Sequence, residues 1–129
     1  MPPYPEAILR YTHSARFPQH AIEDYVATLV SVHSRFILER VNVNGSQLCV
    51  RAAEPFANKP VLVITGSDDT LHPREVDERT VAWLADMGAS VEFLYLPDLD
   101  VYGNGHMMMV EDNSEDLAKM IDHWIRSPH

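Results

Sequence analysis

Apolar and polar side chains recur with helical spacing over residues 21–38. Glu23, Asp24 and Arg35 fall on one side of the helical wheel. The apolar or aromatic positions on the other side are Ile22, Tyr25, Val26, Leu29, His33, Phe36 and Ile37. A stripe with this spacing is typical of a helix that buries one face. The pattern predicts one amphipathic helix over residues 21–38.

The second half of the chain carries a different pattern, with short apolar runs separated by a helical stretch. Residues 61–65 form an unbroken apolar run that ends at Gly66, as expected for a strand buried on both faces. Residues 75–87 have helical spacing and are closed by Gly88, a common signal for the end of a helix. Residues 91–96 read as a second buried strand. The order is therefore strand, helix, strand.

A last helix follows residue 112. Asn113 or Ser114 suits the N-cap, and Glu115 and Asp116 suit the first turn, where the helix dipole favours negative charge. The apolar face consists of Leu117, Met120, Ile121, Trp124 and Ile125. Because crossover connections are right-handed, the two strands are expected to be parallel. The predicted class is α/β, with a parallel strand-helix-strand-helix unit.

The remaining segments give weaker patterns. The first 20 residues carry four prolines and predict an irregular lead-in with at most one helical turn at residues 6–11. Between residues 39 and 59, an Asn44-Gly45 turn separates two short runs, residues 40–43 and 47–52. This arrangement fits a hairpin, and it fits a cap-like loop and helix equally well.

Composition narrows the class of protein. A chain of 129 residues is about one domain, and its net charge of −9 argues against binding to nucleic acid or to an anionic membrane surface. The single cysteine, Cys49, cannot form an internal disulfide, which fits a reducing compartment. No apolar run approaches the roughly 20 residues that span a bilayer, and the N-terminus lacks the apolar core of a signal peptide. We expect a soluble, cytoplasmic protein.

Two loops carry the candidate chemistry. "GSDDTLHP" follows the first strand and "PDLDVYGNGH" follows the second, so both are expected at the carboxyl ends of parallel strands, where ligand sites lie. Gly103 and Gly105 allow a tight turn that would hold His106. An acid on one loop and a histidine on the next suit a carboxylate–histidine pair, in which the carboxylate fixes the imidazole tautomer and stabilises its protonated form.

Three stretches together resemble the C-terminal end of the α/β-hydrolase superfamily, particularly its esterase-like members: "KPVLVITGSDDTLHP", "VAWLADMGASVEFLYLPD" and "GNGHMMMVEDNSEDLAKMIDHWI". The resemblance covers roughly residues 59–125. It implies that Asp69, in a Gly-x-x-Asp turn, is the catalytic acid and that His106 is the catalytic histidine. The alternative alignment, in which Asp68 is the acid, fits the motif less well. The resemblance also implies a partial α/β-hydrolase fold, with residues 1–58 as a mainly helical cap or lid and residues 59–129 as the C-terminal part of the core.

The nucleophile of such an enzyme is missing from the sequence. The family needs a Gly-x-Ser-x-Gly elbow, which this chain does not contain. Ser90, in Gly88-Ala89-Ser90, is expected on a turn at the opposite end of the sheet, and neither Ser46 nor Cys49 has the glycine that the elbow requires. We therefore expect the nucleophile and the oxyanion loop outside this chain.

A sheet of two parallel strands leaves an edge unpaired and an apolar side uncovered. Three completions are open: a second chain that carries the other half, self-association across the open edge, or a rearrangement in which the helix over residues 21–38 covers the sheet.

Other residues near the two loops are secondary candidates. His72 and Met107 are candidates for substrate contact, and Asp98 and Asp100 are reserve acids on the histidine loop. Glu111 could support that loop, but an exposed acid near a helix start is the favoured interpretation. The methionines after His106 are expected to pack on the sheet. The remaining histidines show no zinc-binding spacing, so neither a metal nor another cofactor is expected.

The resemblance implies a serine hydrolase acting on a carboxylic ester or a related acyl compound. In it, His106 would be the general base and acid, and Asp69 would orient the imidazole. The alternative is a non-catalytic scaffold, a dimerisation or regulatory module derived from a hydrolase. Retention of both Asp69 and His106 favours the catalytic interpretation.

Overall fold

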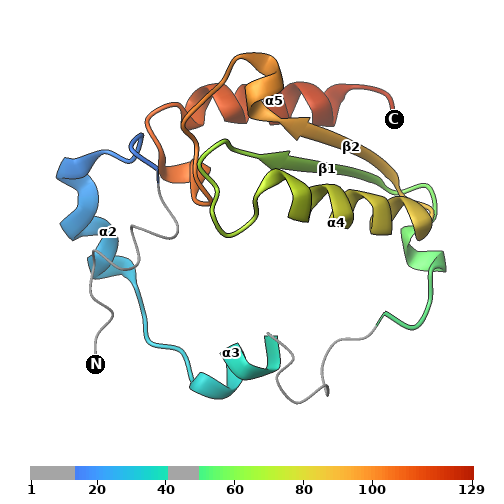
Figure 1. The fold of residues 1–129 in the computed structure, drawn as a ribbon, viewed down its shortest axis with the longest axis horizontal. Helices are drawn as coiled ribbons and strands as arrows, with labels where there is room; N and C mark the ends of the chain where they lie inside the picture. Colours follow the sequence, from blue (N-terminus) through green and yellow to red (C-terminus); the bar gives the residue numbers. More distant parts are fainter. Residues whose placement is uncertain (1–13, 41–49) are drawn as a thin grey trace.

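The computed structural model describes residues 14–40 and 50–129 (Figure 1). Four α-helices and two strands are present in this part of the chain: α2 (Ile22–Thr28), α3 (Ser34–Arg40), β1 (Pro60–Thr65), α4 (Arg74–Asp86), β2 (Ser90–Tyr95) and α5 (Ser114–Arg126). Short 3₁₀ turns join them: η1 (Gln19–Ala21), η2 (Glu54–Phe56), η3 (Leu96–Leu99) and η4 (Met108–Val110).

The two strands pair in parallel, as predicted. The register runs from Pro60 opposite Ser90 to Thr65 opposite Tyr95, so both strands end at the same edge of the sheet. Helix α4 makes the crossover, and α4 and α5 lie on opposite sides of the strands (Figure 1). The strand-helix-strand-helix order is confirmed, and it is compatible with an α/β class.

The burial of β1 differs from the prediction. The apolar run was expected to be buried on both faces, yet Val61, Leu62, Val63 and Ile64 are only half-buried and Thr65 alone is buried. The physical reason is that the described sheet has two strands, so nothing in the described chain pairs with the outer edge of β1. Among the described residues, the buried apolar side chains are correspondingly few: Phe17, Leu96 and Leu117.

The single helix predicted over residues 21–38 is wrong. Two short helices, α2 and α3, replace it, and the backbone turns extended at Leu29, with φ −73° and ψ 129°. The interrupting stretch includes the β-branched residues Val30 and Val32, which are weak helix formers and lie 83% and 57% exposed. An apolar stripe stabilises a helix only when a surface covers it, and within the described part of the chain Val30 and Val32 have no such cover to compensate for their weak propensity.

The N-terminal helices α2 and α3 do not cover the sheet. Figure 1 shows α2 and α3 well apart from both strands, so the rearrangement in which this segment covers the sheet is not the one adopted. Most of the region that suggested a hairpin or a cap-like loop, and the possible helical turn at residues 6–11, lie outside the described residues. Within the described chain, no helix is long and apolar enough to cross a membrane.

Candidate functional site

The loops that follow β1 and β2 are in direct backbone contact. The Asp68 N–H donates to the Asn104 carbonyl at 2.9 Å, and the Gly103 N–H donates to the Ser67 hydroxyl at 2.7 Å. A Cβ at Gly66 would lie 2.1 Å from the Asn104 carbonyl oxygen. Glycine is therefore required at residue 66 for space, and the two loops meet because no side chain separates them.

Asp69 and His106 are brought together at this junction. Asp69 Oδ2 lies 3.0 Å from His106 Nδ1. Its other oxygen, Oδ1, accepts the backbone N–H groups of Leu71 at 2.9 Å and His72 at 2.8 Å. The Asp69 side chain is only 5% exposed, whereas that of His106 is 34% exposed. The backbone N–H groups thus hold the carboxylate through Oδ1, and the imidazole lies between the carboxylate and solvent.

The contact defines the tautomer of His106. An ionised carboxylate only accepts hydrogen bonds, so the Nδ1 of His106 donates to Asp69. The neutral ring then carries its lone pair on Nε2, which is the arrangement of a general base oriented by an acid. Asp68 does not compete for this position, because its exposed carboxylate accepts the Ser67 hydroxyl at 2.8 Å.

Glu111 supports the histidine loop, and the expectation that it would be exposed is wrong. Its side chain is buried, with the residue 2% exposed, and it accepts the Asn104 side-chain amide at 2.7 Å and the Gly105 N–H at 3.0 Å. A third donor is the backbone N–H of Ser14, at 2.9 Å. Three donors offset the cost of burying the carboxylate. The sequence favoured an exposed Glu111 over one that supports the loop, because the donors come from segments that only the fold brings together.

Asn113 occupies the predicted N-cap position of α5 but does not cap the helix with its side chain. Its amide instead forms a reciprocal pair with the buried Asn104, with N···O distances of 2.7 and 2.9 Å. The backbone carbonyl of Asn113 accepts the N–H groups of Asp116 and Leu117. The start of α5 is therefore tied to the histidine loop.

The segment before α2 also reaches the histidine loop. Arg16 donates through Nε to the Tyr102 carbonyl at 2.6 Å and pairs through Nη1 with Asp112 at 3.0 Å. The neighbouring Phe17 is buried. Sequence reasoning found no role for these residues, because an irregular segment has no periodic pattern to indicate what it contacts.

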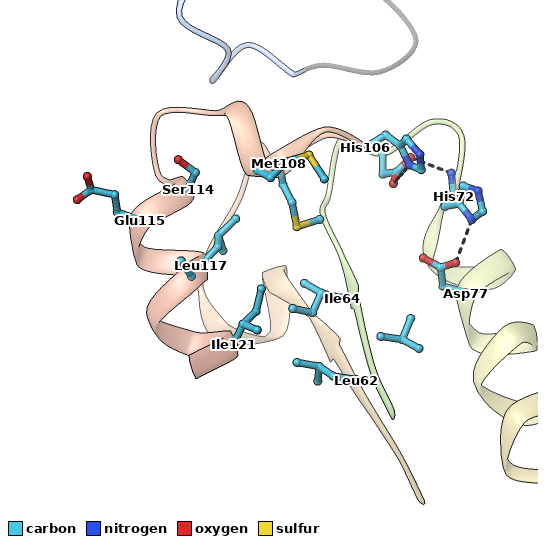
Figure 2. Close-up of a pocket in the computed structure, with 14 residues that line it drawn as sticks. Leu62, Ile64, His72, Asp77, His106, Met108, Ser114, Glu115, Leu117 and Ile121 are labelled. Atoms are coloured by element: carbon cyan, nitrogen blue, oxygen red, sulfur yellow. Dashed lines mark hydrogen bonds and ion pairs between the residues drawn. The ribbon is translucent and has the colours of Figure 1, made fainter. Parts of the chain in front are cut away.

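A cavity of about 700 Å³ adjoins the Asp69/His106 pair (Figure 2). Its walls are mostly apolar and are supplied by β1, α5 and the methionine turn, including Leu62, Ile64, Met108, Leu117 and Ile121. Its polar lining includes Asp69, His72, Asp77 and His106, together with Ser114 and Glu115 of α5. His72, a candidate for substrate contact, lines this cavity. Met108 and Met109 line it as well, whereas Met107 is half-buried and is not among the lining residues.

The other sequence candidates lie away from the pair. Asp100 is exposed, and the exposed Asp98 lies 3.2 Å from Arg74. The hydrogen bond of Arg74 to Glu78, with the nearby Asp98, raises the pKa of the Arg74 guanidinium, so this cation stays charged. Ser90 begins β2, at the edge of the sheet opposite the two loops.

Two further candidates, Ser46 and Cys49, lie outside the described residues. Over residues 14–40 and 50–129, no group of three or more histidine, cysteine, aspartate or glutamate side chains is arranged to hold a metal ion.

Comparison with known proteins gives one partial similarity. The chain is 34% identical over 67 residues to "Probable secreted lipase phiG" of Fungal sp. (strain ATCC 74256), a match that covers 52% of this chain and 18% of the lipase. No model of a protein family matches the chain, and no solved structure matches it. Part of the chain is therefore similar to a hydrolase. The lipase is named as secreted, and a cytoplasmic location for this chain remains a prediction.

Proposed function

We propose that this chain is the C-terminal portion of an esterase-like α/β-hydrolase, which supplies Asp69 and His106 to a Ser-Asp-His triad. The nucleophile comes from outside the chain, since the printed sequence contains no Gly-x-Ser-x-Gly elbow. Residues 59–129 are the core portion and residues 1–58 a cap or lid. The substrate is a carboxylic ester or a related acyl compound, and the chemistry requires no cofactor.

One observation carries the proposal: the 3.0 Å contact between Asp69 and His106, made by loops that follow two successive parallel strands. The backbone N–H groups on Asp69 Oδ1 leave Oδ2 to orient the imidazole. The mostly apolar cavity beside His106 suits the acyl or alcohol part of an ester, and His72, which lines it, is a candidate substrate contact. Met107, predicted as a second contact, does not line the cavity. The similarity to a probable lipase supports the same class of reaction.

In this mechanism His106 moves the proton at each step. Its Nε2 takes the proton of the nucleophile's hydroxyl as that oxygen attacks the acyl carbon, and then gives the proton to the leaving alcohol. In the second half of the reaction, Nε2 takes a proton from the water that attacks the acyl-enzyme and returns it to the nucleophile. Asp69 keeps the ring oriented and stabilises its protonated form.

The test is to treat the native preparation with a fluorophosphonate probe and to take the intact mass of every polypeptide present. We expect the adduct on a co-purifying second chain, together with ester hydrolysis. Replacing His106 with Ala should abolish both the labelling and the hydrolysis, because the serine loses its general base.

Each alternative result contradicts a part of the proposal. An adduct on this chain would place the nucleophile within it, and Ser46 would be examined first. No adduct on any polypeptide, with no ester hydrolysis, would favour the alternative in which the chain is a non-catalytic scaffold, dimerisation or regulatory module.

A further inference from the structure

A second carboxylate–histidine pair lies beside the first. His72 Nδ1 is 3.2 Å from Asp77 Oδ1, and the other oxygen of Asp77 accepts the Thr65 hydroxyl at 2.5 Å. Asp77 lies in the first turn of α4 and is buried, and Thr65 is the buried last residue of β1. The His72 ring is therefore attached to Asp77 at the start of the helix (Figure 2), and Asp77 is attached in turn to the end of the strand.

His72 contacts both members of the Asp69/His106 pair. Its imidazole is stacked on that of His106, with ring centroids 5.1 Å apart and ring planes 18° from parallel. Its backbone N–H donates to Asp69 Oδ1 at 2.8 Å. The side chain thus covers one face of the general base, while the main chain of the same residue holds the acid.

A single hydrogen bond does not fix the plane of an imidazole. The ring can turn about the line that joins Nδ1 to Asp69 Oδ2, and the second side-chain torsion of histidine has broad minima. His106 also lies on a loop directly after two glycines, Gly103 and Gly105, and its side chain is a third exposed. A second contact on the ring face removes this rotation, and the stacked ring of His72 provides it.

We propose that His72 is a positioning residue that holds the plane of the His106 imidazole, and thereby keeps its Nδ1 on Asp69 in the tautomer required of the general base, and that Asp77 and Thr65 hold His72 in turn. This inference goes beyond the proposed function in assigning roles to His72, Asp77 and Thr65, and it rests on that function for the role of His106. The stack itself is a property of the chain and can be measured without any catalysis.

The experiment records the ring ¹⁵N and ¹H signals of the full chain by NMR, at a pH about two units above the ordinary histidine value of about 6.5, where exposed imidazoles are neutral. In the unmodified chain we expect nuclear Overhauser contacts between the His72 and His106 rings. We also expect well-separated Nδ1 and Nε2 signals for His106, as for a single tautomer. His123, which is exposed on α5, provides the averaged signals of an unrestrained histidine.

Two variants isolate the stack. His72→Ala removes the ring but keeps the backbone N–H on Asp69, and we expect the two nitrogen signals of His106 to move together toward those of His123. His72→Phe restores a flat ring without the hydrogen bond to Asp77, and we expect it to restore most of the separation. The Trp124 indole N–H, which donates to Glu92 of β2 at 2.9 Å and does not line the cavity beside His106, reports in each variant that the fold is intact.

Three results would overturn the proposal: no contact between the two rings in the unmodified chain, unchanged His106 signals in His72→Ala, or no difference between the Ala and Phe variants. If His72→Ala unfolds, His72→Leu replaces it, since leucine fills the volume without offering a flat face. A failure of the proposed function would show as absent labelling and hydrolysis with these ring signals unaffected, so the two failures are distinguishable.

Discussion

Adjacent residues of the same type have different surroundings at this site. Asp68 and Asp69 are neighbours in the sequence, yet Asp68 is exposed beside Ser67 while Asp69 is buried against His106 and two backbone N–H groups. The difference follows from the turn after β1, which directs one carboxylate to water and the other into the loop junction. Similarly, Glu111 is buried among donors while Glu115, four residues later, is exposed.

Asp69→Asn should lower kcat of the complete enzyme by about 10⁴-fold while leaving KM nearly unchanged. The Asn carbonyl oxygen can keep the N–H groups of Leu71 and His72, so its amide nitrogen would face His106 Nδ1 and force the wrong tautomer. Steady-state hydrolysis of a simple aryl ester measures the effect. Asp68→Asn is the matched control, and equal loss in the two variants would contradict the assignment of Asp69.

Glu111→Ala should lower the free energy of unfolding by about 3 kcal/mol, because it leaves buried donors on Asn104 and Gly105 without an acceptor. Urea titration followed by circular dichroism measures the change. The control is Glu115→Gln in the first turn of α5, for which we expect less than about 1 kcal/mol from the lost helix-dipole interaction. Similar values for the two variants would mean that the Glu111 contacts contribute little to stability.

At the scale of elements, a pattern forms its predicted element where packing supports it. Helix α4 forms where predicted and packs against both strands, and α5 forms where predicted with Leu117 buried and Trp124 bonded to Glu92 of β2. The pattern over residues 21–38 instead gives α2 and α3 with exposed Val30 and Val32 between them. The loops after β1 and β2 are ordered by contact with each other. Gly66 lies against the Asn104 carbonyl, where an added Cβ would be 2.1 Å from the oxygen.

Gly66→Ala should separate these two loops, because its Cβ would overlap the Asn104 carbonyl and the backbone cannot yield as a side chain does. We expect a loss of about 3 kcal/mol in stability and loss of the His106 contact to Asp69. Thermal unfolding and the His106 ring signals measure the two effects.

Gly88→Ala is the control for Gly66→Ala. It has a positive φ of 89° but more space, since an added Cβ would lie 3.5 Å from the Cα of Ala57, so a loss of about 1 kcal/mol in stability is expected and the ring signals should not change. If Gly66→Ala leaves the His106 signals intact, the close approach of the loops is not what aligns the pair.

At the scale of the whole molecule, the sheet is too small to bury its own apolar side chains. Over the described residues it has two strands, and β1 keeps half-exposed apolar positions along its length. The cavity between β1 and α5 adds further apolar surface next to the Asp69/His106 pair. Such a surface favours association, either with a second chain that continues the sheet or with another copy of this chain.

We expect sedimentation of the native preparation to show a species larger than the monomer, in which this apolar surface is covered. Ile121→Lys places a charge on the wall of the cavity and should return the chain to a monomer. The control is Ile125→Lys on the same helix, where the side chain is 63% exposed and does not line the cavity. A monomer at every concentration before any substitution would contradict this proposal.

The sequence alone determined the order and type of the elements in the second half of the chain. The apolar runs at residues 61–65 and 91–96, the helical stretch between them and the amphipathic stripe of α5 are local patterns, and local hydrogen bonding with one-sided burial suffices to specify them. The same patterns predicted that the loops of Asp69 and His106 would lie at one edge of the sheet, since parallel strands end together.

Only the tertiary structure decided which side chains meet within that edge. The choice of Asp69 over Asp68, the burial of Glu111 and the stacking of His72 on His106 depend on contacts between residues as far as 97 positions apart, as in the bond from Ser14 to Glu111. The break between α2 and α3 has the same origin. Burial and long-range hydrogen bonding depend on what else occupies the space, and no periodic pattern along one segment contains that information.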